Sequence, residues 1–238
     1  MKLDLSLLKK FGSYVLKNIT TVFFCFLILT IGCDLFINEQ EVPTGDLMPL
    51  AVGNYWEYES IILSRHRDTL RQEVTAEVHV PIGDTIYTAY AMNFVPLPPD
   101  FPSYYWLRRN GEEGLYLMGG IADTDTLFMY EVEYKLPIRV GEVFEAPQIA
   151  FSFSRHEFYI SDALRITLVD DDREVVTPAG KFECYVYNFD LSAGDDVVER
   201  LDYYMFYSPG VGLVKLEERT ELSQNIIVEM ILMKYQVQ

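Results

Sequence analysis

The chain of 238 residues carries 36 acidic and 19 basic side chains, which gives a formal net charge of −17. Because nucleic-acid binding requires a basic surface, this balance excludes nucleic acid as a partner. Half of the residues are hydrophobic, and the 17 Tyr and 15 Phe favour β-strands and suffice for a sizeable core.

Residues 1–32 have the composition of a bacterial export signal. Four lysines and one acid precede an apolar run from Thr20 to Ile31 that contains no charge. This run of about a dozen residues is short of the roughly 20 that a membrane-spanning helix needs. We therefore expect a signal helix that is removed after export, with an uncleaved signal anchor as the alternative.

Cys33 ends the apolar run and is the predicted lipidation site. Lipoprotein signals usually end in a lipobox, which has Leu three residues before the Cys and Gly or Ala directly before it. Here Gly32 and Cys33 match, while Leu29 lies one place early. Two acyl chains on Cys33 would anchor the mature chain in a membrane. This predicts a place in the bacterial cell envelope, periplasmic or on the outer surface.

Removal of residues 1–32 leaves 35 acidic and 15 basic residues, a net charge of −20, which suits solubility or contact with cationic partners.

With Cys25 in the signal and Cys33 lipidated, Cys184 has no partner for an intrachain disulfide, and we expect it to be a small buried apolar residue. Residues 33–47 are acidic, contain Pro and Gly and lack periodicity. They are predicted to be a flexible tether before a β-rich domain at 48–238.

Alternation of apolar and polar residues with a period of two predicts β-strands throughout the mature chain. The even-numbered residues from Val74 to Val80 are expected to share one strand face. Residues 226–233 are apolar at every position except Glu229, so this strand is expected to be covered on both faces. The predicted strands span residues 54–63, 68–80, 84–93, 103–109, 114–119, 126–135, 149–160, 163–170, 173–177, 181–190, 199–207, 211–220 and 225–236.

Short turns rich in Gly, Asp and Asn join these segments, which indicates antiparallel hairpins. We expect an all-β fold, an antiparallel meander of about a dozen strands that forms a curved sheet, an open barrel or a sandwich, because a flat sheet of this size would expose long edges.

Residues 49–56 (PLAVGNYW) and 137–144 (PIRVGEVF) share the pattern P, two residues, V, G, two residues, aromatic. The Pro and Gly would form a turn, and the aromatic residue would begin the next strand. A half-repeat of this kind would divide the domain into two halves that meet near residue 136. Chance similarity is the alternative.

Three segments together resemble a known family. They are PLAVGNYWEY (49–58), VTPAGKFECYVY (176–187) and YYMFYSPGVGLVKLE (203–217). They resemble the start, hairpin and closing patterns of the DUF3108-like or TapB-like family of secreted bacterial proteins of unknown function. The resemblance implies export and fold but no activity. Pro209 and Gly210 are expected to turn the chain between two strands, and Gly212 permits a bulge or a close backbone approach.

No catalytic, metal or cofactor motif is found, since the sequence contains no HExxH, GxSxG, CxxC or GxGxxG. His66, His79 and His156 lie in different predicted segments, which favours isolated histidines over a zinc site. Acidic clusters with the chemistry to ligate calcium lie at 123–125, 170–172 and 195–196. They lack the spacing of an EF-hand loop, and Asp is common in hairpin turns, so we expect neither metal nor cofactor.

The segment VPLPPDFPSYYWLRR (95–109) combines four prolines with Tyr104, Tyr105 and Trp106. An extended Pro-rich loop that displays aromatic residues suits contact with an apolar, glycan or peptide ligand. The alternative is a rigid loop whose aromatic rings pack on the core.

The sequence favours a noncatalytic, lipid-anchored envelope protein that binds a ligand or a partner through a concave face or the aromatic loop. A cell-surface polysaccharide hydrolase that uses an Asp or Glu pair and a purely structural envelope protein are the alternatives. An apolar cavity is expected for the first and two facing carboxylates about 5 to 10 Å apart for the second. The third predicts neither.

Overall fold

The computed structural model describes residues 46–95, 104–123, 125–136, 138–152, 155, 157–190, 201–220 and 225–238. All of them belong to the compact unit Pro43–Gln238. The predicted signal, Cys33 and nearly all of the predicted tether lie outside the described residues. Within the described residues, no helix has the length and apolar character to cross a membrane.

The described part of the chain forms twelve strands, and they make one antiparallel sheet. The strands are β1 (Tyr55–Ile62), β2 (His66–Ile82), β3 (Thr85–Val95), β4 (Tyr104–Gly111), β5 (Gly114–Ala122), β6 (Thr126–Lys135), β7 (Val143–Ser152), β8 (Glu157–Thr177), β9 (Gly180–Asp190), β10 (Leu201–Ser208), β11 (Gly212–Thr220) and β12 (Ile226–Gln236). Their order is β6-β5-β4-β3-β2-β1-β12-β11-β10-β9-β8-β7. This confirms the predicted all-β antiparallel meander.

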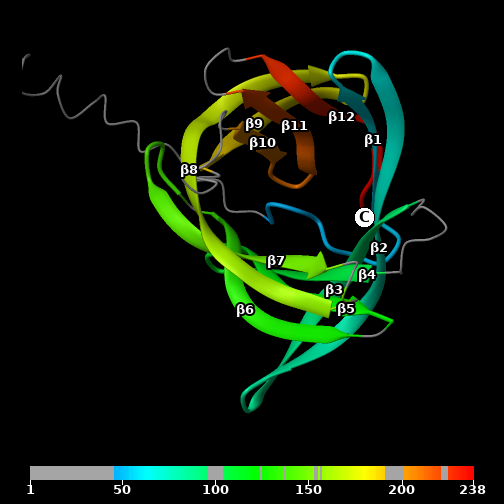
Figure 1. Cartoon of the computed structure of the whole chain (residues 1–238), viewed down its shortest axis with the longest axis vertical. Helices are drawn as coiled ribbons and strands as arrows, with labels where there is room; N and C mark the ends of the chain where they lie inside the picture. The colour runs from blue at the N-terminus through cyan, green and yellow to red at the C-terminus, as the bar shows by residue number, and fades with distance from the viewer. Residues whose placement is uncertain are drawn as a thin grey trace, which may run out of the picture. The chain divides into compact units, whose positions relative to one another are not determined.

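The sheet curls into a nearly closed barrel. Figure 1 looks along the curl and shows the strands arranged in a ring. The two edge strands, β6 and β7, come into contact, although the hydrogen-bonded order starts at one and ends at the other. Curling of this kind shields edges that a flat sheet would expose to other chains.

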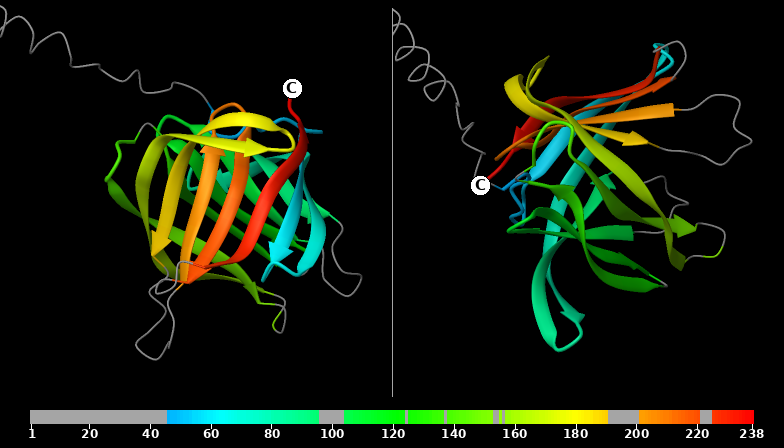
Figure 2. Two further views of the ribbon diagram at one scale, coloured as in Figure 1. Left: turned by 90° about the horizontal axis from the view of Figure 1, so that it is seen from above. Right: turned by 90° about the vertical axis from the view of Figure 1, so that its left-hand side faces the viewer.

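Strand direction alternates along the meander, so the two ends of the barrel differ. One end holds the first described residues, the C terminus and the turns β2–β3, β4–β5, β6–β7, β8–β9 and β10–β11. Figure 2 shows the first described residues, in blue, and the C terminus together at this end. The β1–β2 turn lies at the opposite end, which we call the loop end, and β3, β5, β7, β9 and β11 also end there.

Residues 46–50, which we call the strap, cross the first end of the barrel. Leu47 and Met48 are 1% and 2% exposed, so the strap packs into the core, and Leu47, the last residue of the predicted tether, belongs to that core. Gly210 N donates a hydrogen bond to the Asp46 carbonyl at 2.8 Å. Asn110 Nδ2 donates to the Met48 carbonyl at 2.7 Å. These bonds hold the strap to the β10–β11 turn and to β4, so we name this end the strap end.

The motifs that carry the family resemblance meet at the strap end. Trp56 Nε1 donates to the Val211 carbonyl at 2.5 Å, and the Tyr58 hydroxyl donates to the Leu213 carbonyl at 3.1 Å. Asn54 is fully buried; its Nδ2 donates to the Pro49 carbonyl at 2.8 Å and its Oδ1 accepts from Gln238 N at 3.0 Å. The motif residues therefore have structural roles.

A bulge in β2 divides the apolar residues between two cores. Val74 pairs with Met92 and Ala76 with Ala91, which leaves Thr75 as the extra residue. Val74 belongs to the main core inside the barrel, whereas Val80 belongs to a second core on the opposite face of β2–β6. The predicted single face from Val74 to Val80 is wrong because an inserted residue reverses the alternation.

The described residues of the two PxxVG segments, 49–53 and 138–141, form similar turns. Gly53 and Gly141 have φ angles of +93° and +84°, which favour glycine. Gly53 N donates to the Val74 carbonyl at 2.9 Å, and Gly141 N donates to the Leu168 carbonyl at 2.7 Å. In each case the strand that follows pairs with the next strand of the single sheet, so β1 and β7 begin after turns of the same kind.

Other strand predictions need correction. The predicted strand at 149–160 covers the end of β7 and the start of β8, which are separate strands, and the two predicted strands at 163–170 and 173–177 are one strand, β8. Two register shifts near Asp170 accommodate the acidic residues, and the strand continues beyond them. In β12, Met230 and Leu232 are buried while Ile226 is 40% exposed, so the predicted double cover is wrong for the strand as a whole.

Candidate functional site

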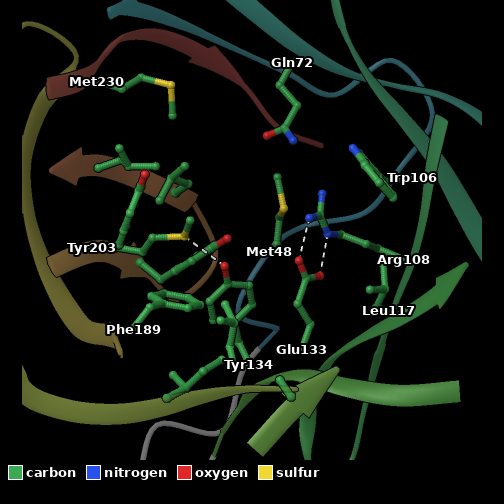
Figure 3. Close-up of a pocket in the computed structure, with 17 residues that line it drawn as sticks. Met48, Gln72, Trp106, Arg108, Leu117, Glu133, Tyr134, Phe189, Tyr203 and Met230 are labelled. Atoms are coloured by element: carbon green, nitrogen blue, oxygen red, sulfur yellow. Dashed lines mark hydrogen bonds and ion pairs between the residues drawn. The ribbon is translucent and has the colours of Figure 1, made fainter. Parts of the chain in front are cut away.

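A cavity of about 460 Å³ lies inside the barrel. Most of the side chains that line it are apolar or aromatic, and Figure 3 shows them converging from several strands. They are Met48, Gln72, Trp106, Arg108, Leu117, Glu133, Tyr134, Ala146, Leu164, Ile166, Phe189, Tyr203, Met205, Tyr207, Leu213, Leu216 and Met230. The volume falls within the range of small-molecule sites, about 300 to 1,000 Å³.

Met48 comes from the strap, so the cavity is completed by a segment that lies outside the sheet. The peptide carbonyl of Met48 is fixed by Asn110 and its side chain points into the space that the strands enclose (Figure 3). The strap therefore contributes to the cavity as well as covering the end of the barrel.

Arg108 and Glu133 form an ion pair on the cavity wall. Arg108 Nε donates to Glu133 Oε2 and Arg108 Nη2 donates to Glu133 Oε1, both at 2.6 Å. The two side chains are only 14% and 16% exposed. A paired, bidentate geometry is what makes a charge tolerable in such surroundings.

Burial alone would lower the pKa of Arg108, but the charge of Glu133 and its hydrogen bonds outweigh burial and raise the pKa. The guanidinium therefore stays protonated beside its carboxylate. The pair as a whole adds no net charge to the cavity.

A bulge places the acidic partner. Leu115 pairs with Tyr134 and Tyr116 pairs with Val132, so Glu133 is the extra residue in β6. A bulge can turn two consecutive side chains to one face of a strand. Glu133 and Tyr134 both line the cavity accordingly, opposite Arg108 of β4.

Three tyrosines contribute the other hydroxyl groups of the cavity. Burial is the main cause that raises the pKa of Tyr134 and of Tyr207, and it raises the pKa of Tyr203 to about 12 with help from Glu218. Their hydroxyls therefore stay protonated near neutral pH and can donate hydrogen bonds. The Tyr134 hydroxyl donates to Met205 Sδ at 2.8 Å, and the rings of Tyr134 and Tyr207 lie 4.6 Å apart.

The carboxyl groups of this wall bear on the predicted alternative of a polysaccharide hydrolase. Glycoside hydrolysis uses two carboxyl groups that flank the bond to be broken. Among the described residues that line the cavity, Glu133 is the one carboxylate, and both of its oxygens are engaged by Arg108. The described part of the cavity therefore offers no carboxylate pair.

The three predicted contact residues of β4 are divided between its two faces. Trp106 lines the cavity. Tyr104 lies on the same face, with its ring 5.8 Å from that of Trp106, which in turn lies 5.7 Å from Phe158. Tyr105 packs against the second core on the opposite face. Alternation along a strand accounts for this division.

The remaining candidate residues are not gathered into one site by the described structure. His66 and His79 are exposed at separate positions of β2, and His156 lies outside the described residues. Cys184 is buried, as predicted, and burial raises its pKa to about 12, so its thiol is inert as a nucleophile near neutral pH.

The predicted acidic clusters differ in their roles. Asp170, Asp171 and Asp172 place carboxylate oxygens within 4.8 Å of one another. Asp170 already accepts hydrogen bonds from Arg173 and from the amide of Asp172. Asp125 Oδ2 accepts from Phe158 N at 2.6 Å, which fixes the β7–β8 side of the loop end. The pair at 195–196 lies outside the described residues.

A second hollow of about 480 Å³ lies on the opposite face of β8–β11. Its walls are charged: Glu217 is bound by Lys215 at 2.7 Å and by Arg219. Because these charges neutralise one another within the wall, the hollow has the character of a surface ion-pair network.

Sequence reasoning missed the ion pair. Arg108 and Glu133 are 25 residues apart and meet because β4 and β6 flank β5 in the sheet. The available signal was the position of Arg108 two residues after Trp106, which places both on one strand face. The bulge that turns Glu133 inward has no sequence signature of its own.

Comparisons with known proteins were made for the whole chain. No family model and no curated protein matches it, so the family resemblance rests on the three segments quoted above. Two crystal structures are similar. One is a predicted lipoprotein from Parabacteroides distasonis, with a TM-score of 0.44 and 14% identity over 82% of this chain and 100% of that one. The other is a predicted exported protein with a YmcC-like fold from Bacteroides fragilis, with a TM-score of 0.41 and 13% identity over 81% of this chain and 100% of that one. Similarity at these levels carries no conclusion about function.

Proposed function

We propose that the protein is a noncatalytic, lipid-anchored protein of the bacterial cell envelope that binds an apolar small molecule inside its barrel. The observation that carries the proposal is the cavity of about 460 Å³, whose wall is mostly apolar and aromatic. When an apolar ligand displaces water from such a cavity, the free energy of the system falls, which favours binding. A purely structural envelope protein would have no need of it.

Binding is tested with the uncharged fluorophore N-phenyl-1-naphthylamine and the unit Pro43–Gln238, which contains every described residue. Fluorescence should rise on binding and saturate with one molecule per chain. Ala146 is 3% exposed and lines the cavity, so Ala146→Trp should fill the space and weaken binding at least tenfold.

The matched control is Ala76→Trp, since Ala76 is exposed on β2 and does not line the cavity. Circular dichroism and urea unfolding verify that both variants fold, and Leu216→Trp provides a second way to fill the cavity. Binding that survives both filling variants at the wild-type level would overturn the cavity as the site.

Anchoring is tested separately on the protein purified from membranes. The order of basic residues, apolar run, Gly32 and Cys33 predicts a diacylglyceryl group on Cys33 as the new N terminus. Mass spectrometry of the N-terminal peptide should detect it, and Cys33→Ser should abolish it. An intact Met1 with an unmodified Cys33 would overturn the anchor and leave the cavity proposal standing.

A further inference from the structure

The two charged side chains of the cavity lie at one place on its wall. Arg108 from β4 and Glu133 from β6 form the ion pair, and Gln72 from β2 lines the cavity on the side of the Arg108 guanidinium in Figure 3. Leucines, Ile166, methionines and three tyrosines line most of the remainder. Gln72 is 6% exposed. A ligand that satisfies such a wall has one polar end and an apolar body.

The ion pair leaves hydrogen-bonding capacity for that polar end. It uses Nε and Nη2 of Arg108, and in Figure 3 the third guanidinium nitrogen points away from Glu133 into the cavity. Each carboxylate oxygen of Glu133 has further lone pairs. The wall can thus donate a hydrogen bond from Arg108 and accept one at Glu133, within a single pair of residues.

Net charge decides which polar group fits. Inside a cavity of low dielectric, a charged ligand group must give up its hydration and find a compensating charge. Arg108 is already neutralised by Glu133 at 2.6 Å. A ligand carboxylate at Arg108 would lie beside the like charge of Glu133, and a ligand ammonium at Glu133 would lie beside Arg108. An uncharged group meets neither penalty.

The volume of the cavity limits the size of the apolar part of the ligand. A water molecule occupies about 30 Å³ in the liquid, so the cavity has room for roughly fifteen volumes of that size. The cavity of about 460 Å³ therefore suits a single chain of about a dozen carbons with a small head group.

We infer that the cavity selects uncharged amphiphiles, with a hydroxyl or amide group bound between Gln72, Arg108 and Glu133 and a single hydrocarbon chain against the apolar wall. The inference rests on the proposed binding function and names the ligand class. Arg108 and Glu133 together are the specificity-determining residues.

The test is a head-group series on one chain, in which each compound displaces N-phenyl-1-naphthylamine from Pro43–Gln238 near neutral pH and below its micelle concentration. Dodecanol and dodecanamide should displace the probe at concentrations at least tenfold lower than dodecanoate and dodecylamine. Long-range electrostatic attraction would give a different order of affinities, because the net charge of the chain, −17, would favour the amine over the alcohol.

Substitutions in the ion pair should shift the head-group preference in opposite directions. Glu133→Gln leaves Arg108 uncompensated and should shift the carboxylate-to-alcohol affinity ratio at least tenfold toward dodecanoate. Arg108→Gln should shift selectivity toward dodecylamine in the same way. The double variant Arg108→Gln/Glu133→Gln restores a neutral wall and should again prefer the uncharged compounds, so it serves as the matched control.

The outcomes separate the two proposals. If neither the probe nor any dodecyl compound binds, the proposed function fails. If the probe binds but dodecanoate or dodecylamine displaces it as well as the alcohol does, the binding function stands and the charge selectivity is overturned. The wild-type series decides the question even if a single variant does not fold.

Discussion

Glu217 shows how a single acidic residue can be stabilised on the outer face of the sheet. It is 4% exposed, and Lys215 Nζ lies 2.7 Å from its Oε1 while Arg219 Nε donates to its Oε2 at 2.9 Å. Burial alone would raise the pKa of Glu217, but these hydrogen bonds and positive charges outweigh burial and lower the pKa. Lys215 also binds Glu229, the cross-strand neighbour of Glu217, at 2.7 Å.

A lowered folded-state pKa predicts a direction for the pH dependence of stability. The contribution of Glu217 is present above its unfolded pKa and is lost as the pH falls through its folded pKa. Glu217→Gln should lower the free energy of unfolding by about 1–3 kcal/mol near neutral pH and have a smaller effect in strong acid. Urea unfolding of both proteins across acidic pH measures this difference. A cost independent of pH would contradict the ionic role.

Strand β5 depends on glycine for its place in the sheet. Gly119 has a φ of +135°, and a Cβ atom there would lie 2.0 Å from the Leu127 carbonyl oxygen of β6. A Cβ atom on Gly120 would lie 2.5 Å from the ring of Phe158. The two glycines thus permit the close approach that positions Leu117 on the cavity wall and Phe158 against Trp106.

Replacement of Gly119 by Ala is expected to be costly because both the backbone angle and the neighbouring backbone oppose a Cβ atom. We expect Gly119→Ala to lower the free energy of unfolding by about 3 kcal/mol or more. The control is Gly83→Ala, which has a φ of +58° but no atom within 4 Å of the added Cβ, and which should cost about 1 kcal/mol. Urea unfolding compares the two variants, and equal costs would show that the approach of β6 is not tight.

The two sides of the barrel differ in how their strands are hydrogen-bonded. β1 and β12 pair along eight positions, from Tyr55 opposite Gln236 to Ile62 opposite Val228. At the opposite seam β6 and β7 are the edge strands of the order and contact each other without being neighbours in it. Amide hydrogens of edge strands exchange faster than those of interior strands because fewer of them are hydrogen-bonded to a neighbouring strand.

Hydrogen exchange should therefore divide the barrel at this seam. Amides of β6 and β7 are expected to exchange at least tenfold faster than those of β1 and β12, which have partners on both sides. Exchange followed by mass spectrometry on peptides from the four strands measures the ratio, with β1 and β12 as the internal reference. Equal protection would indicate a barrel closed by hydrogen bonds at β6–β7.

The sequence predicted much of the β architecture because local alternation and turn chemistry are written in consecutive residues. Most strand positions, the antiparallel connections and the burial of Cys184 followed from such patterns. Two of the strand errors occurred where bulges intervened, at Thr75 and beside Asp170. A bulge reverses which face a residue occupies, and it depends on the register with the partner strand, which no single segment specifies.

Composition, charge, the export-like pattern of the N terminus and the β class can all be read from consecutive residues. The cavity and its ion pair exist only in the folded chain. Arg108 and Glu133 come together across β5, Trp106 and Tyr105 are separated to opposite faces, and Met48 enters from the strap. These arrangements result from the curl of the sheet and the pairing of strands remote in sequence, so local patterns do not contain them.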